Sequence, residues 1–282
     1  MFPYLGTLPL DQITPPQLLA VLRRVESRGA TESAHRLKQT VGQVFRFAVA
    51  TGRAQRDITP DLKGALATHK KQHFPAITEP AQVGRLLNML DNYEGTSTVR
   101  AALKLAPLVF VRPKELRHAE WSEIDVGKKE WRIPAAKMKM GVDHIVPLSR
   151  QALEVIEEQR CITGHWNGYV FPSARSPRRP MSDNAILSAF RNMGIGKDEM
   201  TGHGFRAMAR TILDEVLGER VELIEHQLAH AVKDSLGRAY NRTTHLPKRK
   251  KMMQRWADYL DDLRIQANSS NVVTANFTKT IS

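Results

Sequence analysis

The stretch QLAHAVKDSLGRAYNR, from Gln227 to Arg242, places a histidine ten residues before a tyrosine among basic side chains. The phenol of a tyrosine ordinarily has a pKa of about 10. Tyr240 would therefore need activation by His230 or by nearby cations to act as a nucleophile near pH 7. Taken alone, the stretch is equally typical of a basic helix end at the surface. Its chemistry depends on partners elsewhere in the chain.

Two arginines earlier in the chain are typical of an anion-binding site. Arg112 directly precedes Pro113, and a residue before proline avoids the α conformation. Arg112 is therefore expected at the entrance of a helix. A helix N-terminus together with a guanidinium group favours the binding of phosphate. His203 and Arg206, in TGHGFRAMAR, are three residues apart at the start of an expected helix. That spacing puts both side chains on one side, where they can donate to one anionic group. Each feature alone is also typical of an ordinary surface arginine or a satisfied histidine.

Lys139 lies in the expected hairpin turn of KMKMGVDHIVPLS. An ammonium group on a turn can reach into a cleft and donate a proton, although solvated lysines in turns are common. Three other lysines, Lys128, Lys129 and Lys137, lie close to the same hairpin and are alternatives for this role.

The composition favours a partner that is a polyanion. The 282 residues carry 42 Lys and Arg against 29 Asp and Glu, a net charge of +13 and a pI near 10.0. Nucleic acid is the default partner of such a chain, and a merely basic, solubilising surface ranks second. The single cysteine, Cys161, allows no internal disulfide, which fits a reducing cytoplasm. The sequence contains neither a secretory signal nor an apolar run of about 18 residues, so we expect no membrane partner.

The N-terminal part reads as a small helical unit. One helix is expected to begin after Thr14 and to end at Gly29, and a second to run from Thr31 to Gly52. The expected apolar face of the second helix comprises Leu37, Val41, Val44, Phe45 and Val49. Its other face is basic and is expected to bind DNA together with two lysines of the following linker; these residues are His35, Arg36, Lys38, Gln39, Arg46, Lys70 and Lys71.

The remainder reads as a larger mixed α+β unit. Helices are expected from Thr78, two strands in EWRIP and HIVPLS form a hairpin, and a third strand is expected near Ile124. Helices return from Ser182 until about Leu263. The predicted fold is therefore mainly α with a small β-sheet. The predicted domains are residues 1–70, a linker at 71–78, a second domain at 79–264, and a flexible or partner-exchanged tail at 265–282.

The order of the polar residues resembles that of the tyrosine recombinases, or phage-type integrases. RPKEL, from Arg112 to Leu116, is similar to their first-arginine box, with Glu115 in a supporting position, and HGFR and LAH are similar to the second and third boxes. Lys139 matches their hairpin lysine and Tyr240 their nucleophile. The sequences of the segments QVFRFAVATGRA and QLAHAVKDSLGRAYNR are most similar to those of the P4-like prophage integrases. The resemblance covers roughly residues 1–263.

Two departures from that subgroup stand out. Its members normally carry an additional N-terminal arm-binding domain, most or all of which this chain is expected to lack. The spacing from His230 to Tyr240 is also one residue longer than is common. The resemblance implies a helical, SAM-like core-binding domain followed by a mixed α+β catalytic domain, which close as a clamp around duplex DNA.

The resemblance also implies the roles. Arg112 and Arg206 would bind the non-bridging oxygens of a phosphodiester. His203 and His230 would add donors or accept the phenol proton, and Lys139 would protonate the departing 5′ oxygen. Tyr240 would then hold the DNA 3′ phosphate covalently, with no metal, ATP or other cofactor. The implied partners are attachment sites in double-stranded DNA, a homotetramer on paired sites, and accessory DNA-bending or excision factors, in the bacterial cytoplasm at the nucleoid.

Three alternative interpretations of the function remain open. HQLAH, from His226 to His230, has the histidine spacing of a zinc helix, but Gln227 stands where the glutamate base of such an enzyme belongs. A non-catalytic, sequence-specific DNA-binding protein would explain the charge but not the ordered set of six polar residues. A type IB topoisomerase would share the cleavage chemistry.

Overall fold

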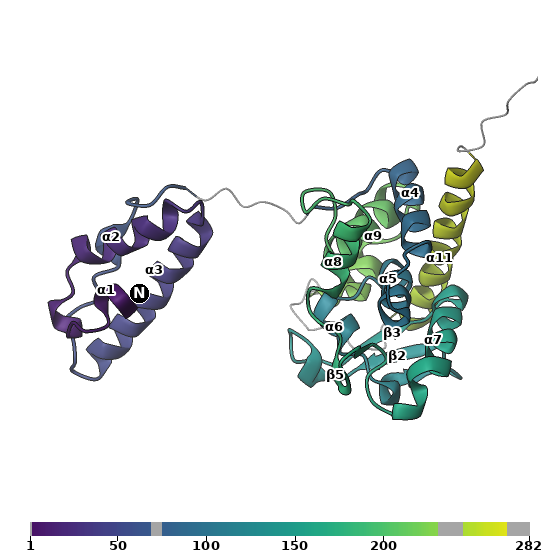
Figure 1. The fold of residues 1–282 in the computed structure, drawn as a ribbon, viewed down its shortest axis with the longest axis horizontal. Coiled ribbons are helices and arrows are strands. Elements are labelled where there is room, and N and C mark those ends of the chain that lie inside the picture. Colours follow the sequence, from purple (N-terminus) through teal and green to yellow (C-terminus); the bar gives the residue numbers. More distant parts are fainter. Residues whose placement is uncertain (1, 69–74, 231–244, 270–282) are drawn as a thin grey trace, which may run out of the picture. The chain divides into compact units, whose positions relative to one another are not determined.

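The structure, a computed structural model, describes residues 2–68, 75–230 and 245–269 (Figure 1). The chain divides into two compact units, Met1–His73 and Phe74–Ser282. Each unit has its own cluster of buried apolar side chains, and none of the described residues belongs to both clusters. In the described part of the chain, no helix combines the length and the apolar composition needed to cross a membrane.

The N-terminal unit is helical, as the sequence predicts. It contains α1 (Phe2–Leu5), α2 (Pro15–Glu26) and α3 (Thr31–Ala50), with short 3-10 turns at Leu10–Gln12 and Pro60–Leu62. The expected cap of α2 forms, because both the backbone N–H and the hydroxyl of Thr14 donate to Oε1 of Gln17, at 2.9 and 3.0 Å. Leu18 and Leu22 of α2 pack against Phe45 of α3 in the core of this unit.

The expected apolar face of α3 is partly wrong. Val41 and Phe45 are buried, but Val44 and Val49 are 47% and 40% exposed. Ala34 and Ala48 occupy the inward positions instead. The buried face of α3 therefore includes small residues, which a prediction based on large apolar side chains does not identify.

The second unit is built from helices around two small sheets. The helices are α4 (Pro80–Asp91), α5 (Ser97–Val109), α6 (Pro113–Arg117), α7 (Arg150–Thr163), α8 (Ala185–Asn192), α9 (Gly204–Glu215), α10 (Val221–Gln227) and α11 (Leu246–Ser269). Single 3-10 turns lie at Trp121–Glu123, Ala135–Lys137 and Gly164–Trp166. α11 lies along α4 (Figure 1). A Cβ atom on Gly84 would come within 2.4 Å of the Leu263 carbonyl oxygen, so glycine permits this close approach.

The end of α11 differs from the sequence-based expectation. We expected the helical region to end near Leu263 and the tail to begin at residue 265, whereas α11 continues to Ser269. Leu260 and Leu263 are buried, and Asn88 of α4 donates to the Arg264 carbonyl oxygen, so packing against α4 supports the last turns. The rest of the tail, 270–282, lies outside the described residues.

The expected strands form a three-stranded antiparallel sheet in the order β1 (Ile124–Asp125), β2 (Glu130–Ile133) and β3 (His144–Pro147). Trp131 pairs with Val146, and both side chains are fully buried. A separate two-stranded hairpin, β4 (Pro172–Ser173) and β5 (Ser176–Pro180), was not predicted.

The segment between α5 and α6 turns sharply. Phe110 adopts the left-handed conformation, with φ 37°, and its ring meets Trp256 of α11 edge to face at 6.1 Å between centroids. The indole N–H of Trp256 also donates to the Pro107 carbonyl oxygen at 2.9 Å. These contacts fix the chain direction just before Arg112.

Candidate active site

Arg112 lies at the entrance of α6, as expected from the proline that follows it. Its backbone is extended, with φ −66° and ψ 145°. The carboxylate of Glu115 accepts from the Arg112 backbone N–H and from Nη1, each at 2.8 Å. Glu115 is 4% exposed, so its negative charge is buried beside the guanidinium. This pair holds Arg112 in one orientation and partly neutralises it.

Arg206 of α9 is 6% exposed and is held by backbone oxygens from two distant segments. Nη1 donates to the Phe110 carbonyl oxygen at 3.1 Å, and Nη2 donates to that of Leu228 at 2.6 Å. Nη2 also lies 3.2 Å from Nε2 of His230. Burial, followed by the charge of Arg112, lowers the pKa of Arg206 to about 10. The guanidinium therefore stays charged at neutral pH in a fixed position.

The end of α10 supplies the Leu228 carbonyl oxygen and His230. The His230 N–H donates to the Glu225 carbonyl oxygen at 3.0 Å and the Ala229 N–H to that of His226 at 3.2 Å, while Ala229 has a φ of 50°. This is the Schellman arrangement that ends a helix, here with alanine in place of the usual glycine. The reversal turns the Leu228 carbonyl toward Arg206 and the Ala229 carbonyl toward Arg112, whose Nη2 lies 3.5 Å away.

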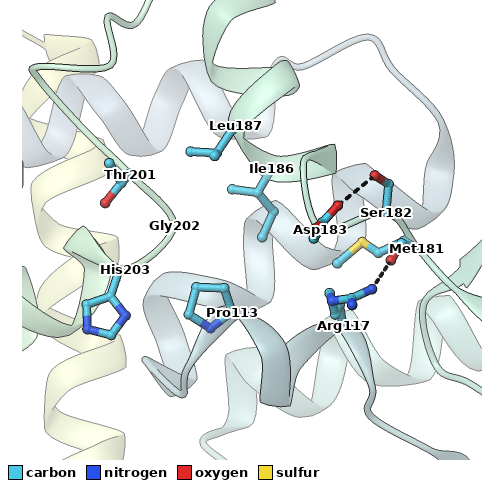
Figure 2. Close-up of a pocket in the computed structure, with 10 residues that line it drawn as sticks. All are labelled: Pro113, Arg117, Met181, Ser182, Asp183, Ile186, Leu187, Thr201, Gly202 and His203. Atoms are coloured by element: carbon cyan, nitrogen blue, oxygen red, sulfur yellow. Dashed lines mark hydrogen bonds between the residues drawn. The ribbon is translucent and has the colours of Figure 1, made fainter. Parts of the chain in front are cut away.

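His203 lies at the N-terminus of α9 and shares this environment. Burial lowers its pKa, the charges of Arg206 and Arg112 lower it further, and Glu115 opposes them. A neutral imidazole is the consequence at pH 7. His203 also lines a pocket of about 210 Å³ with Pro113, Met181 and Ile186 (Figure 2). The structure thus brings Arg112, Glu115, His203, Arg206 and His230 together from three separate segments.

One further residue of this cluster was missed by the sequence analysis. Oε2 of Glu225 lies 2.5 Å from Nδ1 of His230, and its Oε1 accepts from Nε of Arg210 at 2.6 Å. Arg210 in turn binds Asp214 at 2.7 Å. Glu225 and His230 are five residues apart, which is not a helical neighbour spacing, so only the reversal at Ala229 brings them together.

The lysines near the hairpin have different environments. Lys139 is exposed in the turn between β2 and β3, and in the described parts of the chain its ammonium makes no hydrogen bond or ion pair. Lys137 is bound by Glu120 at 2.7 Å, by Glu123, and by the His118 carbonyl oxygen at 2.9 Å. Burial lowers the pKa of Lys137, but these bonds outweigh burial and hold the pKa above its usual value. Lys128 is paired with Asp125 at 3.1 Å. Lys137 is thus engaged in the fold, whereas Lys139 is accessible.

Three of the expected residues lie outside the described residues, namely Tyr240, Lys70 and Lys71. Within α3, Arg36 binds Glu32 and Arg46 binds Asp57, and the side chains of His35 and Lys38 bind the carbonyl oxygens of Ala67 and Leu62. Gln39 is exposed. Four of the five expected DNA-binding side chains of α3 therefore also have contacts within their own unit.

The local backbone does not support the interpretation of HQLAH as a zinc-binding helix. α10 ends at Gln227, and the left-handed Ala229 separates His226 from His230, so the two do not share one continuous helix. Across residues 2–68, 75–230 and 245–269, no group of three or more His, Cys, Asp or Glu side chains could hold a metal ion.

Comparison with known proteins adds sequence and fold relationships. Residues 77–246 match the model of the phage integrase family, and residues 1–65 match the phage integrase central domain. The integrase of Enterobacteria phage P4 is 39% identical over 275 residues, covering 93% of this chain and 62% of that protein. The chain therefore spans less than two thirds of the length of this relative.

Two solved structures have the same fold at low sequence identity. A crystal structure of a lambda integrase (75–356) dimer bound to a COC′ core site is 21% identical, with a TM-score of 0.62, and covers 83% of this chain and 84% of that one. A lambda integrase tetramer bound to a Holliday junction is 21% identical, with a TM-score of 0.61, and covers 83% of this chain and 68% of that one.

Proposed function

Because this chain belongs to the phage integrase family, we propose that it is a site-specific DNA recombinase that integrates and excises a prophage or genomic island. The observation that carries the proposal is the buried cluster in which Arg206 bridges Phe110, Leu228 and His230 beside the Arg112–Glu115 pair. A fixed pair of guanidinium groups suits one phosphodiester, because each can donate two hydrogen bonds to anionic oxygens.

The proposed reaction begins with attack by the Tyr240 oxygen on the scissile phosphorus. The bond between phosphorus and the 5′ oxygen breaks, and a 3′-phosphotyrosyl bond forms. Arg112 and Arg206 neutralise the charge that develops on the non-bridging oxygens. His203, with its lowered pKa, is suited to accept the phenol proton, and Nε2 of His230 contacts the Arg206 guanidinium that would bind the phosphate.

Lys139 is the proposed general acid for the departing 5′ oxygen. Its exposed ammonium on the β2–β3 turn supports this choice over Lys137, which two glutamates and a carbonyl oxygen already bind. The phosphotyrosyl bond conserves the energy of the phosphodiester, so a second 5′ hydroxyl can reverse the step. The reaction therefore requires neither ATP nor a metal ion, and cleavage should continue in excess chelator.

Double-stranded attachment sites are the proposed partner. The net charge of +13 supports this, and the similar lambda integrase structures include a dimer on a core site and a tetramer on a Holliday junction. We propose the same tetrameric assembly on two paired sites, with accessory DNA-bending or excision factors and with tails exchanged between neighbours. Such a protein would work at the bacterial nucleoid. The core-binding domain would be residues 1–70 and the catalytic domain residues 79–264.

Covalent capture on DNA tests the proposal. A suicide duplex with a nick close to the cleaved phosphate traps the phosphotyrosyl intermediate, because the short 5′ fragment diffuses away. The wild-type chain should form the adduct, and Tyr240→Phe should abolish it while binding stays within about twofold. An adduct that persists in Tyr240→Phe would contradict the assignment, and Tyr259→Phe would be tested next. A topoisomerase would relax supercoiled DNA without a requirement for two paired sites.

A further inference from the structure

The β4–β5 hairpin, residues 172–180, carries three exposed arginines and is called the arginine hairpin below. Arg175 lies in the two-residue turn between the strands, and Arg178 and Arg179 are neighbours in β5. Successive residues of a strand point to opposite faces. Because Arg178 and Arg179 are both exposed, both faces of β5 present a guanidinium group to solvent.

No carboxylate in the described residues neutralises this charge. None of the three guanidinium groups makes an ion pair or a hydrogen bond within those residues. Arg178 shares a shallow pocket with Glu120, but the Glu120 carboxylate is bound to Lys137 at 2.7 Å. Three like charges within five residues repel one another, so this arrangement is expected to meet an external anion.

The base of the arginine hairpin is fixed beside the candidate active site. β5 continues directly into Met181, whose carbonyl oxygen accepts from Nη1 of Arg117 at 2.8 Å. Met181 and Arg117 line the same pocket as Pro113 and His203 (Figure 2). The hairpin is thus attached to α6, the helix that begins immediately after Arg112.

We propose that the arginine hairpin binds phosphates of the DNA duplex next to the phosphodiester that is cleaved. This inference rests on the proposed function. Guanidinium groups match phosphate geometry, and contacts to the DNA backbone fix the register of the protein without reading sequence. The hairpin would therefore strengthen binding of any duplex and would place the cleaved bond over Arg112 and Arg206.

The test compares two double variants of the full chain with equal loss of charge. Arg178→Ala/Arg179→Ala removes both β5 arginines. The control Arg85→Ala/Arg100→Ala removes two exposed arginines, one from α4 and one from the first turn of α5, the helix end remote from Arg112. The affinity for a duplex with a core site and for a scrambled duplex is measured over a range of salt concentrations.

The β5 variant should bind both duplexes more weakly, and the slope of log K against log salt should fall by about 0.9 for each lost phosphate contact. The control should keep the wild-type slope. An unchanged salt slope in the β5 variant, or an equal change in the control, would overturn the inference. The proposed function would still stand in that case if the wild-type chain binds DNA. A wild-type chain that does not bind DNA would instead remove the proposed function.

A second inference comes from the independent contact between Glu225 and His230. A guanidinium group only donates hydrogen bonds, so Nε2 of His230 accepts from Nη2 of Arg206 at 3.2 Å. The imidazole proton is then on Nδ1, which donates to Oε2 of Glu225 at 2.5 Å. Arg210 holds the other carboxylate oxygen of Glu225 at 2.6 Å. The ring of His230 is therefore fixed at both nitrogens.

The geometry points to Glu225 as a positioning residue for His230 in phosphodiester cleavage, again resting on the proposed function. Glu225 selects the tautomer and holds the ring so that Nε2 faces Arg206. Without the carboxylate, the imidazole can rotate, since its side chain is 48% exposed. A misplacement of about 1 Å can slow a reaction by about 10²-fold.

Single-turnover cleavage of the suicide duplex at saturating protein tests this role. Glu225→Ala should slow cleavage by about 10²-fold, while the affinity for DNA stays within about twofold. Glu225→Gln retains an oxygen that can accept from Nδ1 and should recover much of the rate. Asp214→Ala is the control, because it removes the other partner of Arg210 and leaves the Glu225–His230 contact in place.

A double-mutant cycle separates positioning from a purely structural role. In the His230→Ala background, Glu225→Ala should cause little further loss of cleavage. If the two losses multiply, or if Glu225→Ala cleaves at the wild-type rate, Glu225 does not act through His230. The adduct formed by the wild-type chain in the same assay shows separately whether the proposed function holds.

Discussion

Nη2 of Arg249 in α11 donates to Oε1 of Gln227, the last residue of α10, across 2.6 Å in a site closed to solvent. The same guanidinium donates to the Ile145 carbonyl oxygen of β3 at 2.5 Å. Burial lowers the pKa of Arg249 to about 10, so it stays charged at neutral pH. The helix that follows the Tyr240 segment is thereby attached to the hairpin that carries Lys139 and to the helix that precedes His230.

Arg249→Met should lower the free energy of unfolding by about 1–3 kcal/mol, because the oxygens of Gln227 and Ile145 lose a buried donor. Thermal and urea unfolding of the full chain measure this. Arg255→Met is the control on the same helix, since Arg255 is exposed and pairs with Glu219 at 3.0 Å. A surface pair contributes about 0–1 kcal/mol. Equal losses in the two variants would mean that the buried contact adds no particular stability.

Arg112 and Arg206 should act on the transition state more than on binding. Arg206→Ala and Arg112→Ala should each reduce cleavage by about 10²–10³-fold, the usual loss for one such donor. Many other basic residues share the non-specific affinity, so duplex binding should change little. Arg206→Lys should also cleave poorly, because an ammonium group cannot reproduce the fork that spans Phe110 and Leu228. Parallel losses of binding and cleavage would identify the arginines as backbone anchors.

Lys139→Met should slow cleavage by about 10²–10⁴-fold, as expected for loss of a general acid, without lowering the melting temperature. A duplex with sulfur in place of the 5′ bridging oxygen should restore the rate, because a thiolate leaves without a proton. Lys137→Met should instead lower the melting temperature, since Glu120 and Glu123 lose their shared cation. Rescue of Lys137→Met rather than Lys139→Met would exchange the two roles.

The sequence was sufficient to predict the helical N-terminal unit and the β2–β3 hairpin, and it named side chains that the structure brings together in the candidate site. Those features depend on short-range rules, such as Thr14 before two prolines or Arg112 before Pro113. The contacts that orient the site depend on long-range packing. The Phe110 and Leu228 carbonyl oxygens belong to the backbone, which a sequence pattern of side chains does not describe. Glu225 reaches His230 only because Ala229 adopts a positive φ, and the pattern E-x-x-x-x-H was the single signal available in the sequence.

A fragment that begins at Thr78 should retain the catalytic residues but bind DNA more weakly than the full chain. Among the described residues, the apolar cluster of the second unit includes no buried residue from the N-terminal unit, so the fragment is expected to fold. Loss of the basic face of α3 and of Lys70 and Lys71 should reduce the salt slope by about 0.9 per phosphate contact. Fluorescence anisotropy over a salt series measures this. If the fragment binds DNA as tightly as the full chain, the clamp model is wrong.

His144 should make the fold sensitive to mild acid. It is 7% exposed, and burial, with the charge of Arg249, lowers its pKa to about 3. The unfolded chain takes up this proton near pH 6.5 and the folded chain does not, so the stability from this group is complete above pH 6.5 and is lost as pH falls toward 3. The slope approaches about 1.4 kcal/mol per pH unit. Urea unfolding of His144→Gln, which keeps a donor for the Gln227 carbonyl oxygen, should show a smaller loss of stability between pH 7 and pH 5 than the wild type.

The acceptors that aim Arg206 are main-chain oxygens, and a substitution cannot delete a main-chain oxygen. Replacing Phe110 or Leu228 by another apolar residue changes the shape of the support but leaves its hydrogen-bonding groups in the chain. Substitutions at these two positions should therefore preserve the hydrogen bonds to Arg206, provided that the left-handed turn at Phe110 and the helix end at Ala229 persist. Inactivating changes in the support should accordingly concentrate in substitutions that alter chain direction, proline above all.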